Sequence, residues 1–196
     1  MILFMTLWMG LVILTVSKVD RRVLKSREAI KNAVLELMSE KTFDEITIQD
    51  IADRANVNRS TIYLHYTDKF DLLDKLIEEH IEEMRNIAEW ACELDWIEAT
   101  RIFFEYFESH YLFFSTMLAS KGAPSFRSRF LEYLIGSFRS ELHKEGTKDQ
   151  RIDEDVMLRF IGTAYVGVVE WWITTGMPYS PAVMAQQVGL LLERHF

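Results

Sequence analysis

The chain has 196 residues, enough for one or two small domains, and its hydrophobic content of 49% supports a buried core, which excludes a disordered protein. With only 8 Gly and 3 Pro, most of it can run as uninterrupted helix, and its single Cys excludes an internal disulfide framework and fits a reducing cytoplasm. The net charge of −8 argues against a nucleic-acid partner, but the acidity is unevenly distributed. Residues 17–69 contain ten Lys and Arg against nine Asp and Glu, whereas residues 70–196 contain twelve against twenty-one.

The first segment, residues 1–16 (MILFMTLWMGLVILTV), is an apolar leader without a charged side chain. It lacks the positive region and the cleavage site of a signal peptide, and as a helix it would span roughly 24 Å, short of a hydrocarbon core of about 30 Å. Basic residues follow it, so a membrane tether would leave the rest of the chain in the cytoplasm. A translation start placed too far upstream is the favoured interpretation, with the tether and an ordinary N-terminal helix as alternatives.

Residues 20–39 are predicted to form the first helix of a small N-terminal unit, since their apolar side chains recur with helical spacing. Basic residues gather at its start and supply much of the positive charge of this part of the chain: Lys18, Arg21, Arg22, Lys25 and Arg27.

Residues 46–73 predict two short helices joined by a tight turn, followed by the start of a third helix. The first short helix covers residues 47–54, where Thr47 and Asp50 have the spacing of a capping box and apolar residues recur at i, i+3, i+4 and i+7. Asn58 is expected to cap the second short helix, residues 59–66, which buries only Ile62 and presents hydrogen-bonding side chains. Such a helix suits insertion into a major groove, so the chain is predicted to read DNA.

The run T-I-Q-D-I-A-D-R-A-N-V-N-R-S-T-I-Y-L-H-Y-T-D-K-F-D-L-L resembles the DNA-binding domain of TetR-type transcriptional regulators. The family pattern is a Thr that opens the first short helix, I-A-x-x-A, a turn, and then S/N-x-x-T-h-Y-x-x-F/Y-x-x-K-x-x-L, and every one of these positions is filled. Two mild departures are Asn58, where Ser is commoner, and Ser60, where Gly or Ala is commoner. The resemblance covers about a quarter of the chain, and it implies a DNA-binding regulator with a divergent helical ligand-binding domain.

The predicted DNA contacts follow from side-chain chemistry. Thr47 can offer its hydroxyl and backbone N–H to a phosphate, Arg59 can pair with a guanine edge, and Lys69 can meet a phosphate as a point charge. Tyr63 suits a phosphate oxygen, a role that the resemblance also implies, and His65 either contacts DNA or packs against Tyr66. The full predicted set is Thr47, Asn58, Arg59, Ser60, Thr61, Tyr63, His65, Tyr66 and Lys69.

A long helix from Asp68 to about Leu94 is predicted next, and it is expected to place Cys92 in the core as a small apolar residue. No Gly- or Ser-rich linker separates it from the DNA-binding domain, so the domains are predicted to span residues 17–67 and 68–196 after the leader. A rigid connector can transmit a ligand-driven movement that a flexible linker would absorb. In the family this helix sets the separation of the two DNA-reading heads.

The stretch 96–118 is rich in aromatic residues, and further helices are predicted over 125–143, 153–175 and 181–194, which makes the chain all-α. Aromatic-lined cavities with few polar groups are typical ligand sites, although core packing is the favoured interpretation for any single residue of the stripe. Glu170 is the one acid among apolar residues from 160 to 173. Its carboxylate requires a partner such as His110, His143 or a bound cation, or else exposure to solvent. The predicted ligand pocket comprises Trp90, Phe103, Phe107, Tyr111, Phe114 and Glu170.

The last two helices combine small residues with large apolar ones, which suits a two-fold four-helix interface. The predicted interface comprises Gly162, Gly167, Trp171, Val188, Leu191 and Leu192. A homodimer would also read a palindrome, since one helix-turn-helix reads only one half-site.

The sequence therefore predicts a cytoplasmic, homodimeric regulator that binds a double-stranded DNA operator and is released by an unknown small effector, apolar or cationic. No metal and no cofactor are expected. An enzyme is disfavoured because no nucleophile–base spacing, phosphate-binding glycine loop or metal-ligand cluster occurs. The rival interpretations are a membrane-tethered regulator and a small-molecule-binding protein whose helix-turn-helix no longer reads DNA.

Overall fold

The structure, a computed structural model, describes residues 21–119, 123–145 and 152–194, and within these ranges it consists of helices and connections without a strand. The all-α prediction is confirmed; the apolar leader lies outside the described residues. The elements are α2 (Arg21–Glu40), η1 (Phe43–Glu45), α3 (Ile48–Ala55), α4 (Arg59–Tyr63), α5 (Lys69–Ala91), α6 (Trp96–Ser109), α7 (Tyr111–Leu118), α8 (Pro124–Glu145), α9 (Glu154–Thr174) and α10 (Pro181–Glu193).

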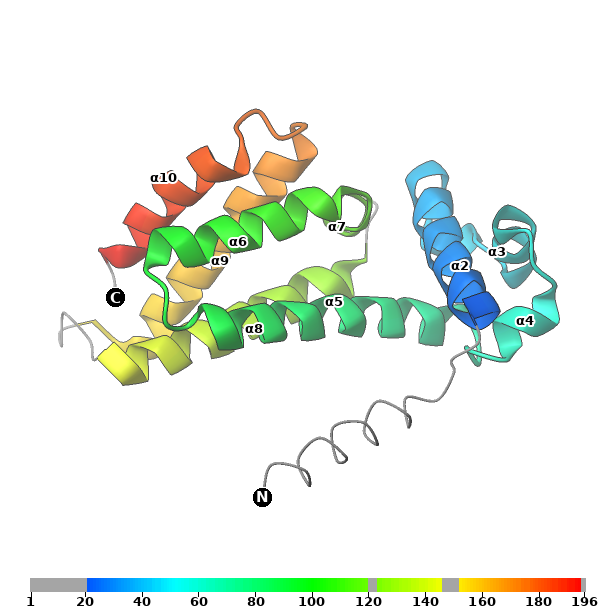
Figure 1. Cartoon of the computed structure of the whole chain (residues 1–196), viewed down its shortest axis with the longest axis horizontal. Coiled ribbons are helices and arrows are strands. Elements are labelled where there is room, and N and C mark those ends of the chain that lie inside the picture. Colours follow the sequence, from blue (N-terminus) through cyan, green and yellow to red (C-terminus); the bar gives the residue numbers. More distant parts are fainter. Residues whose placement is uncertain (1–20, 120–122, 146–151, 195–196) are drawn as a thin grey trace, which may run out of the picture.

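Helices α2, α3 and α4 form the N-terminal domain, drawn in blue and cyan in Figure 1. Its core is formed by branched aliphatic side chains, and α3 packs directly on α2. Ile51 and Ile62 are fully buried, as the helical spacing predicted for these two short helices. The face of α4 opposite Ile62 is therefore turned to solvent.

The capping chemistry of α3 holds the helix-turn-helix together. Thr47 Oγ1 accepts from the Asp50 backbone N–H at 3.1 Å, and an Asp50 carboxylate oxygen accepts from the Thr47 backbone N–H at 2.8 Å. The predicted capping box is thus confirmed. Asn56 ends α3 in the left-handed region with φ 51°, which turns the chain toward α4.

The second short helix differs from its prediction at both ends. Asn58 occupies the N-cap position, but its side chain makes no capping hydrogen bond, so the predicted side-chain cap is wrong. The helix ends at Tyr63 rather than Tyr66, because the backbone N–H groups of His65 and Tyr66 both turn back to the carbonyl of Ile62. This tight turn points the chain toward α5.

Helix α5 joins the two halves of the molecule without a linker (Figure 1). Asp68 accepts hydrogen bonds from the backbone N–H groups of Phe70 and Asp71, which fixes its start. Its 23 residues correspond to about 34 Å. The buried side chains follow helical spacing along its whole length: Leu72, Leu73, Leu76, Ile77, Ile81, Met84, Ile87 and Ala91. Cys92, which follows the helix, is exposed, so its predicted burial is wrong.

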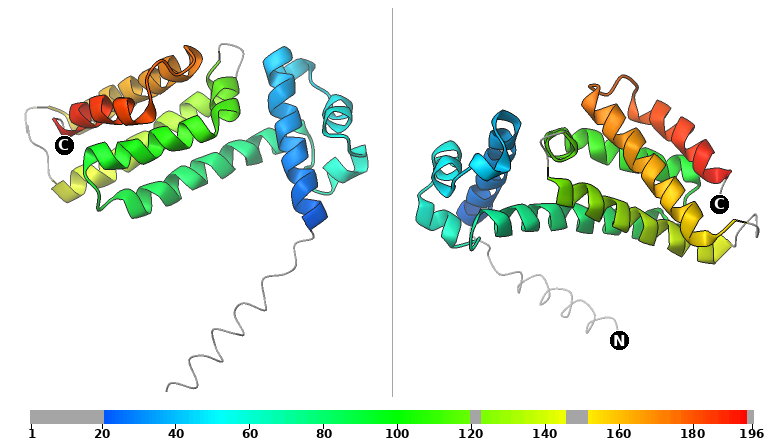
Figure 2. Two further views of the ribbon diagram at one scale, coloured as in Figure 1. Left: turned by 45° about the horizontal axis from the view of Figure 1, so that its top comes forward. Right: turned by 180° about the vertical axis from the view of Figure 1, so that it is seen from behind.

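The remaining helices build the regulatory domain around the far half of α5. Two views in Figure 2 show α8 running along α5, while α10 packs on α6. The aromatic stretch forms two helices rather than one, since the chain bends at His110 between α6 and α7. Helix α9 is long and apolar enough to cross a membrane by composition, but half of the relevant window is buried inside the domain, as in a core helix.

Candidate nucleic-acid interface and effector cavity

The exposed face of α4 is the candidate DNA-reading surface. Arg59, Ser60 and Tyr63 are exposed there, whereas Thr61 is half-buried. Among the described residues none forms an ion pair with the Arg59 guanidinium, so its five N–H donors are available to a ligand. Thr47 is exposed at the start of α3. Four of the predicted contacts, Thr47, Arg59, Ser60 and Tyr63, are therefore exposed to solvent.

A groove beside this face brings the start of α2 next to the turn between α3 and α4. It is lined on one side by Arg22 and Ser26 and on the other by Asn58, Thr61 and His65, among others. The structure therefore places a basic residue from the predicted N-terminal cluster beside predicted contacts on α4. His65 lies against Tyr66 with ring centroids 6.1 Å apart, which matches the packing alternative for this residue.

Two predicted DNA contacts are corrected by the structure. Tyr66 is only 3% exposed and belongs to the core, because the chain turns after Tyr63 instead of continuing the helix. Lys69 donates three hydrogen bonds to the backbone carbonyls of Phe43, Asp44 and Ile46 at 3.0, 2.9 and 2.8 Å. All three donors of its ammonium group are thereby used inside the domain. Lys69 fastens the η1 segment to the start of α5, and its predicted phosphate contact is wrong for this conformation.

The N-terminal domain meets the regulatory domain through a polar junction at the middle of α5. Glu79 of α5 forms ion pairs with Arg27 at 3.2 Å and Lys31 at 2.6 Å, both on α2. The next residue, His80, stacks on Phe113 of α7 with ring centroids 3.6 Å apart, and its Nδ1 lies 2.7 Å from the Tyr106 hydroxyl. Helices α6 and α7 of the regulatory domain and α2 of the N-terminal domain therefore meet α5 at adjacent positions.

Burial keeps the ring of His80 neutral. Desolvation, assisted by the positive charge that His110 and Lys31 can carry, lowers the pKa of His80 to about 3. Burial also raises the pKa of Tyr106 above its ordinary value. Both partners are thus uncharged near neutral pH, and the junction combines an uncharged hydrogen bond with the ion pairs of Glu79. The side chains of Glu79 and His80 thus connect α2, α6 and α7 through α5.

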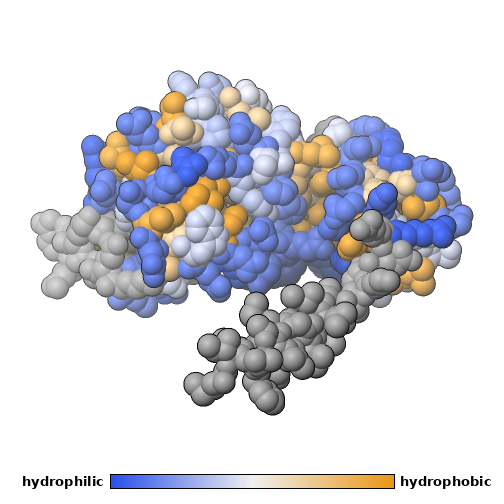
Figure 3. All heavy atoms as spheres, viewed as in Figure 1, coloured by the Kyte–Doolittle hydropathy of each residue, from blue (hydrophilic) through white to orange (hydrophobic). Residues whose placement is uncertain are grey.

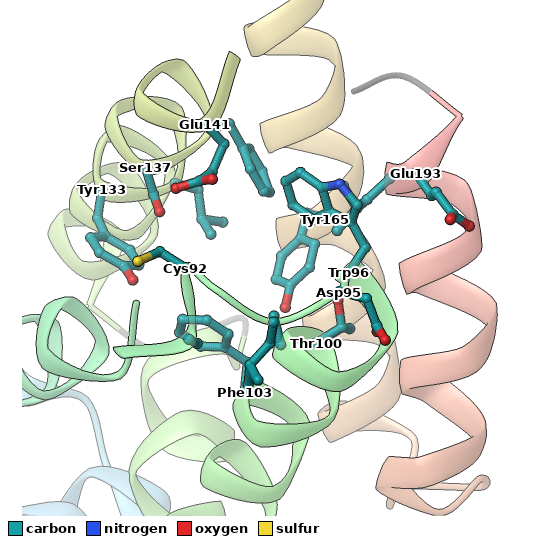
Figure 4. A pocket seen from close by; sticks show the side chains of 16 residues that line it. Cys92, Asp95, Trp96, Thr100, Phe103, Tyr133, Ser137, Glu141, Tyr165 and Glu193 are labelled. Carbon is teal, nitrogen blue, oxygen red and sulfur yellow. The ribbon is translucent and has the colours of Figure 1, made fainter. Parts of the chain in front are cut away.

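The candidate effector cavity lies at the other end of α5 and has a volume of about 380 Å³. That is within the range of about 300–1,000 Å³ for small-molecule sites. Figure 4 shows side chains from several helices converging on it. Its lining residues are Ala91, Cys92, Leu94, Asp95, Trp96, Ala99, Thr100, Phe103, Tyr133, Leu134, Ser137, Phe138, Glu141, Tyr165, Leu192 and Glu193.

Only one of the predicted pocket residues, Phe103, lines this cavity. Phe107 and Phe114 are completely buried in the aromatic core, where their rings pack edge to face with centroids 4.8 Å apart. Trp90 is 58% exposed and Tyr111 is also exposed, so neither faces the cavity. These four predictions are wrong, because the aromatic stripe mostly fills the core.

Glu170 also lies outside the cavity. It is half-exposed and accepts a hydrogen bond from Arg127 of α8 at 3.1 Å, rather than pairing with either predicted histidine. Its exposed position, one of the predicted alternatives, explains how an acid fits in an otherwise apolar helix. The predicted ligand role for Glu170 is therefore wrong.

An exposed apolar face runs along α9 and α10. Among the predicted interface residues, Trp171 is 46% exposed, Leu191 is 55% exposed and Gly167 is half-buried. Further exposed apolar residues on these helices are Val156, Phe160, Val183 and Leu190. We refer to these seven residues as the α9–α10 face. A set of this size on two consecutive helices is typical of a protein–protein interface.

The other three predicted interface residues serve the fold of the subunit itself. Val188 and Leu192 are buried within the domain. Gly162 is buried against α8, where an added Cβ would meet Leu131 at 3.1 Å and Ile135 at 3.3 Å. A small residue at this position permits close packing of α9 on α8, so its predicted place in a subunit interface is wrong.

Comparison with known proteins identifies both halves of the chain. Residues 30–76 match the family described as "Bacterial regulatory proteins, tetR family", and residues 95–194 match "Transcriptional regulator C-terminal region". The Bacillus subtilis (strain 168) protein YxbF, described as an uncharacterized HTH-type transcriptional regulator, is 40% identical over 68 residues. These residues cover 34% of this chain but only 18% of YxbF, so the similarity spans less than a fifth of that relative.

Solved structures extend the similarity to the whole fold. A TetR transcriptional regulator from Streptococcus agalactiae 2603V matches with a TM-score of 0.67 and 26% identity, over 88% of this chain and 96% of that one. FadR from Bacillus subtilis in complex with stearoyl-CoA matches with a TM-score of 0.65 and 19% identity, over 84% and 96% of the two chains, which is a likeness of fold alone. Together with the helix-turn-helix described above, the two family matches show that this chain belongs to the TetR family of DNA-binding transcriptional regulators, which is not a family of enzymes.

Proposed function

We propose that the protein is a cytoplasmic, homodimeric repressor that binds a palindromic operator and is released from it by a small molecule. The observation that carries this proposal is the course of α5. It begins beside the helix-turn-helix and ends at the effector cavity, with no flexible segment between them. One rigid element therefore connects a DNA-reading face with a site of ligand size.

The reading step is assigned to α4 and the start of α3. Arg59, exposed and without an ion-pair partner among the described residues, is suited to bidentate contact with a guanine edge. Tyr63 and Thr47 are suited to phosphates on either side, while Asn58, Ser60, Thr61 and His65 complete the surface. Two copies related by a two-fold axis through the α9–α10 face would present two such surfaces to successive major grooves.

Release from the operator is a shift between two states that differ in the distance between the DNA-binding domains of the two subunits. A ligand in the cavity contacts the last turn of α5 and the first turn of α6, so it can favour one tilt of α5 over another. It acts only through different affinities for the two states. The junction at Glu79 and His80 then moves α2 together with α5.

The test is fluorescence-anisotropy binding to DNA that flanks the protein's own gene, titrated with salt and with unrelated competitor DNA. Tight, salt-sensitive binding that survives the competitor is expected. Arg59→Ala should relax the preference for one base pair by about 1–3 kcal/mol, whereas Tyr63→Phe should weaken binding to all sequences alike. An unchanged base preference in Arg59→Ala would show that α4 is not the reading helix.

A further inference from the structure

The candidate DNA-reading face of α4 ends in an aliphatic side chain, that of Leu64. This residue is absent from the DNA contacts that the sequence predicts, all of which have polar or aromatic side chains. Among the described large hydrophobic residues, Leu64 has the largest exposed fraction, 78%. Single exposed apolar residues are common on protein surfaces, so the exposure of Leu64 alone assigns it no role. Its role follows from its position on the helix.

The backbone fixes the direction of this side chain. Leu64 directly follows α4 and keeps helical dihedral angles, φ −71° and ψ −21°, and its N–H donates to the Ser60 carbonyl at 3.2 Å. Successive residues of a helix are rotated by about 100°, so Leu64 points about 200° away from Ile62, which is completely buried. Leu64 and Ser60 therefore share the face of α4 that is opposite the core of the domain.

The surroundings of Leu64 are those of the candidate DNA-reading surface. Leu64 lines the groove beside α4 together with Thr61 and His65, and Arg22 lines the same groove from the start of α2. The two views in Figure 2 place α3 and α4, drawn in cyan, at the end of the molecule away from the regulatory domain. A duplex that offers polar atoms to Ser60 and Thr61 would therefore meet the Leu64 side chain as well.

The chemistry of Leu64 limits what this side chain can contact in DNA. An aliphatic group offers no hydrogen bond to a phosphate oxygen or to the polar atoms of a base edge. The C5-methyl group of thymine is the apolar feature of the major groove, and apolar side chains make favourable contacts with it. Such a contact removes apolar surface of both partners from water, which stabilises the complex.

We infer that Leu64 is a specificity-determining residue that reads the C5-methyl group of a thymine in each half-site of the operator. Ser60, on the same face, has a small side chain, which permits close approach of the base edges to this part of α4. Cytosine has no methyl group at C5, so Leu64 favours thymine over cytosine at one position without a hydrogen bond. The inference rests on the proposed function in taking α4 as the reading helix.

Replacement of thymine by deoxyuridine tests the inference, because it removes the methyl group and leaves the hydrogen-bonding groups of the base pair in place. The whole protein first selects its binding site from a pool of random-sequence duplexes. Each thymine of the selected site is then replaced by deoxyuridine, one position at a time and in both half-sites together, and fluorescence anisotropy measures the affinity. At one position the replacement should weaken binding of the unaltered protein about tenfold, since two methyl contacts per site are lost.

Variants assign the methyl effect to Leu64. Leu64→Ala should bind the thymine and deoxyuridine duplexes with nearly equal affinity, and this double-mutant cycle isolates the contact from other effects of the substitution. Leu64→Met keeps an apolar side chain of similar volume and should retain most of the preference for thymine. Leu112→Ala, at a leucine that is 40% exposed on α7 of the regulatory domain, is the matched control and should keep the full preference. Circular dichroism shows whether each variant is folded.

A selected site without a methyl-dependent position would overturn the inference, and so would a Leu64→Ala variant that keeps the full preference for thymine. Failure of the proposed function is recognised separately. If no site is selected, or if Arg59→Ala leaves every base preference unchanged, α4 is not the reading helix and the inference falls with it. A selected site whose recognition depends on Arg59 but on no methyl group refutes only the role of Leu64.

Discussion

At the scale of single residues, Lys69 shows how a motif position can serve the fold instead of the ligand. Its ammonium donates to the carbonyls of Phe43 and Asp44 in η1 and of Ile46 just after it, and it also lies 5.0 Å from the ring of Phe43. The Phe43 carbonyl also accepts from the backbone N–H of Ile46 at 3.2 Å, so Lys69 is its second donor. The lysine therefore connects the loop before α3 to the first turn of α5.

We predict that Lys69→Met destabilises the protein by about 2 kcal/mol, since charge-assisted hydrogen bonds to backbone groups are lost. Urea unfolding measures this change. Lys25→Met, which removes an exposed charge from α2, should alter stability by less than about 0.5 kcal/mol. If Lys69→Met instead retains full stability and lowers the salt dependence of DNA binding by one phosphate contact, the original assignment to DNA would be restored.

Charge pairing at this scale also limits the electrostatic attraction of DNA. Four basic residues of the N-terminal domain are held in ion pairs: Arg27, Lys31, Lys41 and Arg54. Residues 17–69 were predicted to have a weak positive balance from the sequence, but this pairing depends on the fold and could not be read from spacing. DNA affinity should therefore depend on a few cations such as Arg59 and show a modest salt slope.

At the scale of elements, helix starts were predictable because capping residues mark them. Thr47, Asp68 and Asp153 each accept a backbone N–H at the expected helix start. The cavity was not predictable, since its lining comes from the ends of α5, α6 and α10 and from α8 and α9, which are distant in sequence. An aromatic stripe has the same spacing whether it fills a core or lines a cavity, so only Phe103 among the six predicted pocket residues lines this cavity.

The packing of α10 on α6 leads to a prediction about one glycine. A Cβ at Gly189 would lie 2.7 Å from the Cα of Ile97, and a backbone atom cannot move aside easily. Gly189→Ala should therefore separate the two helices and cost about 2 kcal/mol. Circular-dichroism thermal unfolding measures the loss.

Gly136 on α8 is the matched control for this substitution. An added Cβ there meets nothing within 4 Å. Gly136→Ala should therefore stabilise the helix by up to about 1 kcal/mol. If the two variants unfolded at the same temperature, close approach of α10 to α6 would not be important for stability.

At the scale of the whole molecule, the distribution of surface character suggests how two copies associate. In the view of Figure 3, hydrophilic residues cover much of the surface, and hydrophobic residues gather in patches, several of them over the regulatory domain. The α9–α10 face belongs to that domain and presents Trp171 and Leu191 to solvent. A two-fold contact there would bury these side chains while leaving both α4 faces free.

We predict that Trp171→Glu or Leu191→Glu weakens the dimer by about 2 kcal/mol or more, because a buried charge replaces an apolar contact at the interface. Sedimentation velocity should then show monomers, and operator affinity should fall with dimer content. Trp90→Glu, at an exposed tryptophan on α5, is the matched control and should leave the dimer unchanged. A stable dimer of both α9 and α10 variants would place the interface elsewhere.

The course of α5 also affects how the protein resists degradation in a cell. Its buried side chains belong to one continuous core that extends from Ile30 in α2 to Leu192 in α10. Melting of either half would expose apolar residues of the same helix, so unfolding is expected to be a single cooperative transition. A destabilising substitution near the cavity would then unfold the entire chain, including the DNA-binding domain, and expose it to cellular proteases. Gene control would be lost because the amount of protein falls, even where every DNA-contacting residue is unchanged.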